Sequence, residues 1–158
     1  MSVSHRMDFQ KLFRSSAMVA SKDKGNRGEV IIRDYLRKET GLNFERTPQS
    51  GASSIKGLKG DLFVMNYANK FTIECKNYEE DGFGSACLLG KGNFNAWWAQ
   101  VTRDAIANGN LPMLIYRWNR SKLYCAIPEH IHTGVDNRIV YKGAAIYLIE
   151  ELNIKELL

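Results

Sequence analysis

Residues 60–77 read GDLFVMNYANKFTIECKN and contain the clearest structural signal of the chain. Two runs of strand-forming residues, about 61–66 and 71–77, flank a short connection, which is the pattern of a β-hairpin. Successive side chains of a strand alternate between its two faces. The second run is therefore expected to place Phe71, Ile73 and Cys75 in the core and to turn Thr72, Glu74 and Lys76 the other way.

A predicted helix and a loop precede the hairpin. From Asn26 to Lys38 apolar residues recur at helical spacing, and Gly41 is a suitable stop signal. Glycine, proline and serine are frequent in Thr47–Gly60, a composition that favours a loop. The residues expected on the buried face of the helix are Val30, Ile31, Tyr35 and Leu36.

Downstream of the hairpin the pattern alternates between helix and strand. We expect a glycine-rich loop from residue 79, a helix that Asn93 or Asn95 caps and Gly109 ends, strands at 111–118 and 122–127, a helical turn at 128–132, and a last strand plus a short helix within 140–158. This order predicts an α/β fold with a mixed, twisted sheet of about five strands flanked by helices. We expect the active site at one end of that sheet.

The composition is that of one folded domain. The chain has 158 residues, of which 44% are hydrophobic and 25% charged, and these values exclude a disordered or collagen-like chain. We expect a single domain at 25–158, preceded by a basic arm or helix at 1–24. There is no apolar run long enough for a membrane helix and no apolar signal peptide, so we expect a cytoplasmic protein. Three widely spaced cysteines predict neither a disulfide framework nor a zinc site.

The positive charge is concentrated in the first part of the chain. The net charge is +5, and residues 1–60 carry +6 whereas residues 61–158 carry −1. A basic face attracts polyanions such as nucleic acid, although the same charge can serve solubility alone. The basic residues expected to contact phosphates are Arg33, Arg37, Lys38, Lys56 and Lys59. In the glycine-rich loop, a mobile flap could contact DNA through Lys91 or Phe83.

Three side chains of the hairpin suggest a site for a divalent cation. Strand ends that bring Asp61, Glu74 and Lys76 together would suit Mg²⁺, which prefers one or two carboxylates, retained waters and phosphate oxygens. A metal there could polarise a phosphodiester and activate water, while Lys76 could orient that water or offset charge that grows on phosphorus. Two further ligands are expected: the backbone carbonyl of Cys75, and Glu29, directly or through water.

These residues resemble the motif of a known group of nucleases. Glu29 on a first helix, Asp61 at a strand start and Glu74-Cys75-Lys76 are similar to the PD-(D/E)xK nuclease superfamily, with Gly60 where proline is usual. Within it, the chain most resembles the archaeal-type Holliday junction resolvases and their phage relatives. The likeness spans residues 24 to about 118 and is carried by Lys24-Gly25, Glu29, Ser50-Gly51, Asp61, Glu74, Lys76, Gln100 and the segment NGNLPMLIYR.

The resemblance implies a restriction-endonuclease-like core and a homodimeric, Mg²⁺-dependent endonuclease that cuts branched DNA. Resolution of Holliday junctions in recombination or repair is the specific expectation, and Mn²⁺ is expected to substitute for Mg²⁺. The resemblance implies that Asp61 and Glu74 bind the metal, that Lys76 acts on the attacking water, and that Glu29 completes the acidic cluster. It also implies that Ser50 or Ser53 contacts a phosphate and that Gln100 supports the site from the neighbouring helix.

Other functions stay open on the sequence alone. A restriction-type nuclease, or a flap or repair nuclease of the same superfamily, would use the same site. A non-catalytic, basic nucleic-acid-binding protein would rely on charge and on aromatic residues, and Mg²⁺ would be irrelevant to it. The substitution Asp61→Asn separates these classes, because it should abolish cleavage by a nuclease and leave a simple binding protein unchanged.

Overall fold

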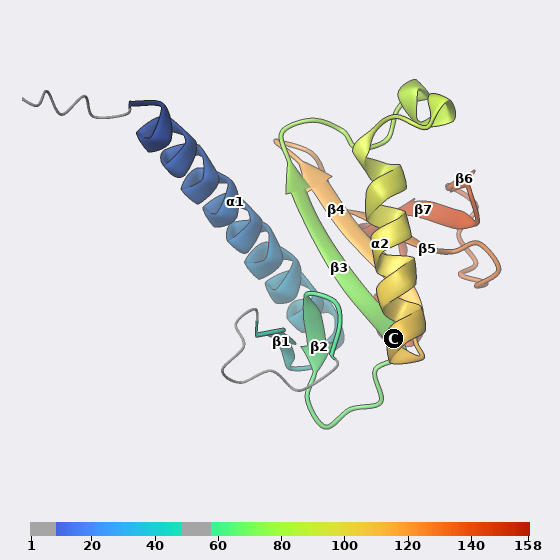
Figure 1. Ribbon diagram of the computed structural model, residues 1–158. Helices are drawn as coiled ribbons and strands as arrows, with labels where there is room; N and C mark the ends of the chain where they lie inside the picture. The colour runs from blue at the N-terminus through green and yellow to red at the C-terminus, as the bar shows by residue number, and fades with distance from the viewer. Residues whose placement is uncertain (1–8, 49–57) are drawn as a thin grey trace, which may run out of the picture.

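The computed structural model describes residues 9–48 and 58–158, and their side chains from residue 22 onward. The elements are α1 (Phe9–Thr40), β1 (Phe44–Arg46), β2 (Leu62–Val64), β3 (Phe71–Tyr78), η1 (Ser85–Leu89), α2 (Asn93–Asn108), β4 (Leu111–Trp118), β5 (Tyr124–Pro128), β6 (Ile139–Tyr141), β7 (Ala144–Leu148), η2 (Ile149–Glu151) and α3 (Ile154–Leu157), where η marks a 3-10 helix. Helices flank one mixed sheet, so the predicted α/β class is confirmed (Figure 1).

The sheet is mixed, as expected, but it has more strands. In the described part of the chain seven strands follow the order β1-β2-β3-β4-β5-β7-β6. Among these seven described strands, β3 and β4 are the one parallel pair, and the crossover helix α2 joins them; the other neighbours are antiparallel. The expectation of about five strands was low because β1 and β6 have three residues each, too few for alternation to be recognised.

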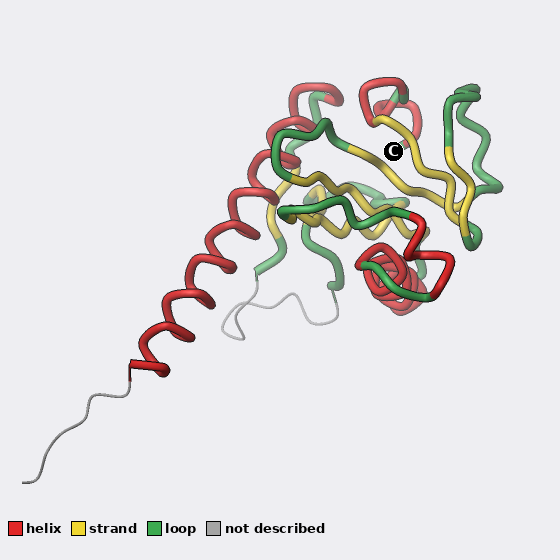
Figure 2. The backbone as a smooth tube through the Cα atoms, turned by 90° about the horizontal axis from the view of Figure 1, so that it is seen from above, coloured by secondary structure: helices red, strands yellow, loops and turns green. Residues whose placement is uncertain are grey.

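Helices cover both faces of the sheet (Figure 2). On one face, Ile32 of α1 shares a core with Phe71, Ile73 and Cys75, which confirms the predicted inward face of β3. On the other face, α2 packs through Trp97 and its neighbours. Because the parallel connection lays α2 over β3, the face that carries the predicted polar side chains is also covered, and Thr72 and Glu74 are buried.

The first helix is longer than predicted. α1 runs unbroken from Phe9 to Thr40 and passes through the boundary expected at residue 24, because no proline interrupts these residues. Its buried face contains Ile32, whereas Ile31, which was expected there, is 42% exposed. α1 approaches β3 so closely that a Cβ at Gly28 would lie 2.4 Å from Cβ of Asn77, so this position has room only for glycine.

The glycine-rich segment before α2 is ordered around a short helix instead of forming an open loop. α2 begins after Gly92, and neither Asn93 nor Asn95 caps it; the amide of Asn95 donates to the carbonyls of Cys87 and Lys91 instead. Gly109 ends α2 as predicted.

The helical turn expected after β5 is a single hydrogen-bonded turn, with the Ile131 amide 3.1 Å from the Pro128 carbonyl. Within the described ranges, no helix has both the length and the apolar character that spanning a membrane requires.

Candidate active site

A cleft opens along β3 where β2 stops pairing with it. The register joins the two strands at Leu62 and Ile73, and beyond that pair no strand of the described chain pairs with this edge of β3. α1 packs against β3 from one side and α2 from the other, and between them lies an open cleft of about 1550 Å³. Its lining brings together the predicted site residues Glu29, Asp61, Glu74, Cys75, Lys76 and Gln100.

The backbone fixes Asp61 at the inner end of the cleft. Gly60 has a φ of +91°, and a Cβ there would lie 2.9 Å from the carbonyl oxygen of Ile73, so a side chain would be strained and crowded. This close approach lets the Asp61 amide donate to Ile73 at 2.7 Å. The Cys75 amide in turn donates to Oδ2 of Asp61 at 2.7 Å. The carboxylate is thereby held beside the backbone of β3, and its second oxygen accepts no hydrogen bond from the described residues.

Glu74, Lys76 and Gln100 form one connected polar group. The side chains at 74 and 76 project from the same face of β3, and Nζ of Lys76 lies 2.7 Å from Oε1 of Glu74. Gln100 reaches down from α2, donates to the same Glu74 oxygen at 2.8 Å and accepts from Lys76 at 3.3 Å. Glu74 is only 4% exposed, and this pairing satisfies a charge that would otherwise be buried alone.

Burial and like charge shift the titration of these groups. The pKa of Asp61 is raised from 3.8 to about 7, first by burial and then by the negative charges of Glu74 and Glu29, against the Cys75 hydrogen bond and the charge of Lys76. Burial lowers the pKa of Lys76, but the hydrogen bond and charge of Glu74 outweigh it, so the pKa is raised overall. Lys76 is consequently an ammonium ion near neutral pH, and Asp61 resists ionisation.

Glu29 is paired with Arg46, a residue that no motif in the sequence marks. Oε2 of Glu29 lies 2.7 Å from Nε and 2.6 Å from Nη2 of Arg46, the last residue of β1. The same Nη2 donates to Oδ1 of Asn26 at 2.8 Å. Arg46 does not stand out in the sequence because its strand is short and lies next to the loop; the pairing of β1 with β2 brings it beside Glu29.

The donor set fits a small, hard cation. Among the described residues, no three His, Cys, Asp or Glu side chains lie close enough together to hold a metal ion. Glu29 forms an ion pair with Arg46. Mg²⁺ needs only one or two carboxylates besides waters and phosphate oxygens. Asp61 and Glu74 supply two carboxylates, and the pKa of Asp61 is raised first by burial and then by neighbouring negative charge, which a cation would offset. The Cys75 side chain faces the core, as expected, so only its backbone is available to the cleft.

None of the described residues that were predicted to contact phosphates lines the cleft. Ser50, Ser53 and Lys56 fall outside the described residues. Arg33 pairs with its neighbour Asp34, and Arg37 binds the carbonyl of Phe44 and the carboxylate of Glu45. The remaining three, Lys38, Lys59 and Lys91, are exposed and do not line the cleft.

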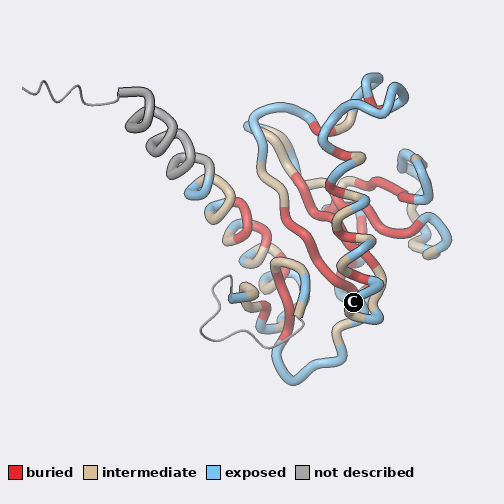
Figure 3. The backbone as a smooth tube through the Cα atoms, in the orientation of Figure 1, coloured by how far each residue is buried: buried red, intermediate tan, exposed pale blue. Residues whose placement is uncertain are grey.

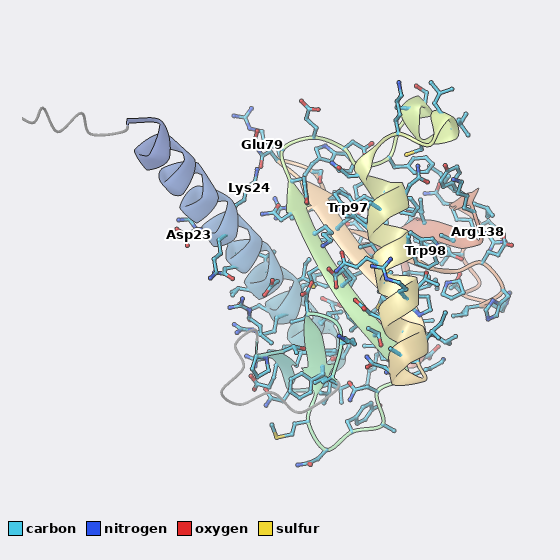
Figure 4. The ribbon with its side chains drawn as sticks, in the orientation of Figure 1. Asp23, Lys24, Glu79, Trp97, Trp98 and Arg138 are labelled. Carbon is cyan, nitrogen blue, oxygen red and sulfur yellow. The ribbon has the colours of Figure 1, made fainter. Side chains whose placement is uncertain are left out.

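Other basic residues line the cleft in their place: Lys24, Arg27, Arg117 and Arg120. Lys24 lies 3.5 Å from Glu79 at the cleft mouth, and Figure 4 shows the two side chains facing each other from α1 and the end of β3. Arg117 stands beside Asn77 in the parallel register of β4 and β3. Its position could be recognised only from that pairing, which joins segments far apart in the sequence.

Comparisons with known proteins relate the chain to nucleases. The family described as "Phage putative PDDEXK endonuclease" matches residues 20–155, a range that contains every cleft residue named above. Protein D14 of Escherichia phage T5 is 36% identical over 114 residues, which cover 69% of this chain and 71% of that protein. A solved structure of Hjc, a Holliday junction resolvase from Archaeoglobus fulgidus, is 17% identical with a TM-score of 0.43, over 84% of this chain and 98% of that one.

Proposed function

The chain belongs to the phage PDDEXK endonuclease family, and from this premise we propose that it is a Mg²⁺-dependent endonuclease that cuts branched DNA, Holliday junctions in particular. The observation that carries the proposal is the convergence of Asp61, Glu74 and Lys76 in one cleft. Such a combination of two carboxylates and one ammonium suits hydrolysis of a phosphodiester. We place the activity in the cytoplasm, where the DNA substrate would lie.

Asp61 and Glu74 are the residues that would hold Mg²⁺, with the Cys75 carbonyl as a further oxygen. When bound, the ion would polarise the phosphodiester and lower the pKa of water, and Mn²⁺ would serve in its place. The protein prepares this site by burying two carboxylates side by side, as the raised pKa of Asp61 indicates. Glu29 takes part from a distance: it orients Arg46, whose Nη1 group has no hydrogen-bond partner among the described residues and would donate to a phosphate oxygen beside the cleft.

Lys76 would act as a cation. Its raised pKa keeps it protonated, so it would donate a hydrogen bond to the attacking water or to a phosphoryl oxygen, where negative charge develops in the transition state. Gln100 contacts both Glu74 and Lys76 and is a positioning residue. By holding the carboxylate and the ammonium in fixed places, it would reduce the reorganisation that the reaction requires.

The preference for branched DNA and the homodimer are the finer parts of the proposal. They rest on the motif that resembles Holliday junction resolvases, from Lys24-Gly25 to the segment that ends at Arg117. A four-way junction requires two paired incisions, and a dimer with two-fold symmetry supplies two sites. The basic side chains along the cleft offer contacts for the phosphates of an arm that enters it.

The test is cleavage of synthetic four-way junctions, flaps and linear duplexes in Mg²⁺, Mn²⁺ or EDTA. We expect the junction to be cut in paired positions with either metal and not in EDTA. Asp61→Asn, Glu74→Gln and Lys76→Ala should each lower the rate at least about a hundredfold, while junction binding by the carboxylate variants is retained. The matched control is Asp136→Asn, which removes a carboxylate that is exposed and does not line the cleft.

The other outcomes identify the alternatives. Cleavage of flaps but not junctions would indicate a repair-type nuclease, and cleavage at defined duplex sequences would indicate a restriction-type enzyme. If purified protein binds DNA but cuts none of these substrates with either metal, the nuclease proposal is abandoned in favour of a binding protein.

A further inference from the structure

A compact lobe projects beside the cleft and presents two leucines to solvent. This η1 lobe, residues 82–92, has the sequence GFGSACLLGKG, in which Lys91 is the only charged residue. Leu88 and Leu89 at its tip are 78% and 75% exposed. Figure 3 shows the lobe as a mostly exposed projection beyond the N-terminal end of α2. Two neighbouring leucines so exposed require an explanation, because nothing in the described part of the chain covers them.

Hydrogen bonds and aromatic contacts hold the lobe against α2 and β6. The hydroxyl of Tyr141 donates to the Cys87 carbonyl at 2.6 Å, and the side-chain amide of Asn95 donates to the same oxygen at 3.3 Å. Phe83 packs edge-on against Phe94 and Tyr141, with ring centroids 5.4 and 5.3 Å away. Phe83, which was expected to contact DNA, is therefore used to anchor the lobe, and the two leucines are the side chains that it presents.

The lobe adjoins the cleft at both of its ends. Glu80, two residues before it, and Asn93, directly after it, both line the cleft. The leucines are thus attached to the rim of the surface that would receive the substrate. Lys91 is exposed next to them and gives the tip a positive charge, which favours a polyanionic partner.

We propose that the η1 lobe is a wedge that inserts Leu88 and Leu89 between stacked bases of DNA at the branch. This inference rests on the proposed function. Apolar side chains, leucine among them, that enter a base step and partly unstack it are a known means of kinking DNA. A protein partner fits this tip less well, because a stable protein interface buries about 800 Å² on each partner, far more than two leucine side chains provide. Bases at a branch are already less well stacked, so the wedge would favour branched over linear DNA.

The experiment uses the full chain and a four-way junction with 2-aminopurine at the branch, a base analogue whose fluorescence rises when it is unstacked. EDTA prevents cleavage during the measurement. We expect wild-type protein to raise the fluorescence, and the double variant Leu88→Ser/Leu89→Ser to abolish the rise and to weaken junction binding about tenfold, as expected for the loss of buried apolar contacts. Affinity for linear duplex should be unchanged.

Two further variants isolate the effect. Ile106→Ser is the matched control, because Ile106 is 75% exposed on α2 and does not line the cleft; it should leave both signals unchanged. Leu88→Met/Leu89→Met keeps an apolar tip and should retain the fluorescence rise. All of these side chains are exposed, so melting curves of the variants should match the wild type.

Retention of the fluorescence rise in the serine double variant would overturn the wedge. If that variant also changed its oligomeric state in light scattering, the leucines would belong to a contact between copies of the chain. Failure of the proposed function is distinguishable, since wild-type protein would then cut no DNA substrate, whereas failure of the wedge alone leaves wild-type cleavage of junctions intact.

Discussion

Replacement of Asp61 by asparagine should stabilise the metal-free protein while abolishing its activity. In the unfolded chain this carboxyl ionises near pH 3.8, and in the folded protein near pH 7, because burial and the charge of Glu74 oppose ionisation. Each unit of pKa difference corresponds to about 1.4 kcal/mol, so ionised Asp61 lowers the free energy of unfolding by about 4 kcal/mol at most. Asparagine carries no charge and can still accept the hydrogen bond from Cys75.

The pH dependence gives the sign of the effect. Below about pH 3.8 the carboxyl is protonated in both states and has no net influence; the destabilisation grows as the pH rises and is complete above about pH 7. Urea unfolding in EDTA should therefore show Asp61→Asn more stable than wild type by a few kcal/mol at pH 8, with the difference shrinking as the pH approaches 4.

Added Mg²⁺ should reverse this order, because it would stabilise the wild-type protein and have little effect on the variant. Asp136→Asn, which removes an exposed carboxylate, is the control and should change stability little at any of these pH values. If Asp61→Asn is equally stable or less stable than wild type at pH 8 in EDTA, the inference that the ionised Asp61 carboxylate destabilises the metal-free cleft is refuted.

Three further substitutions test the packing of the site. Arg46→Ala leaves the buried carboxylate of Glu29 without its partner and should lower the free energy of unfolding by about 1–3 kcal/mol in urea titrations; an unchanged midpoint would contradict the pairing. Gly28→Ala places a methyl group 2.4 Å from Cβ of Asn77 and should cost about 1–3 kcal/mol, seen as a lower Tm, whereas a raised Tm would show that α1 can move away. Gln100→Leu should lower kcat on junctions about tenfold with KM little changed, and a rise in KM alone would argue against a positioning role.

The sequence by itself determined the local features. The alternation in β3 follows from the period of two in any strand, so Phe71, Ile73 and Cys75 could be assigned to the core and Glu74 and Lys76 to one face. The C-terminal ends of α1 and α2 were recognised because glycine readily adopts the backbone angles that stop a helix. These signals depend on residues within a few positions of one another, so they can be recognised without knowledge of the fold.

Only the tertiary structure decided what surrounds those residues. Because α2 packs on β3, Gln100 contacts Glu74, and because the three-residue strand β1 pairs with β2, Arg46 contacts Glu29. The basic lining of the cleft and the mounting of Leu88 and Leu89 likewise depend on contacts between distant segments. The physical reason is that periodicity specifies which face of an element is apolar, whereas the partner of that face is selected by packing and strand register among segments distant along the chain.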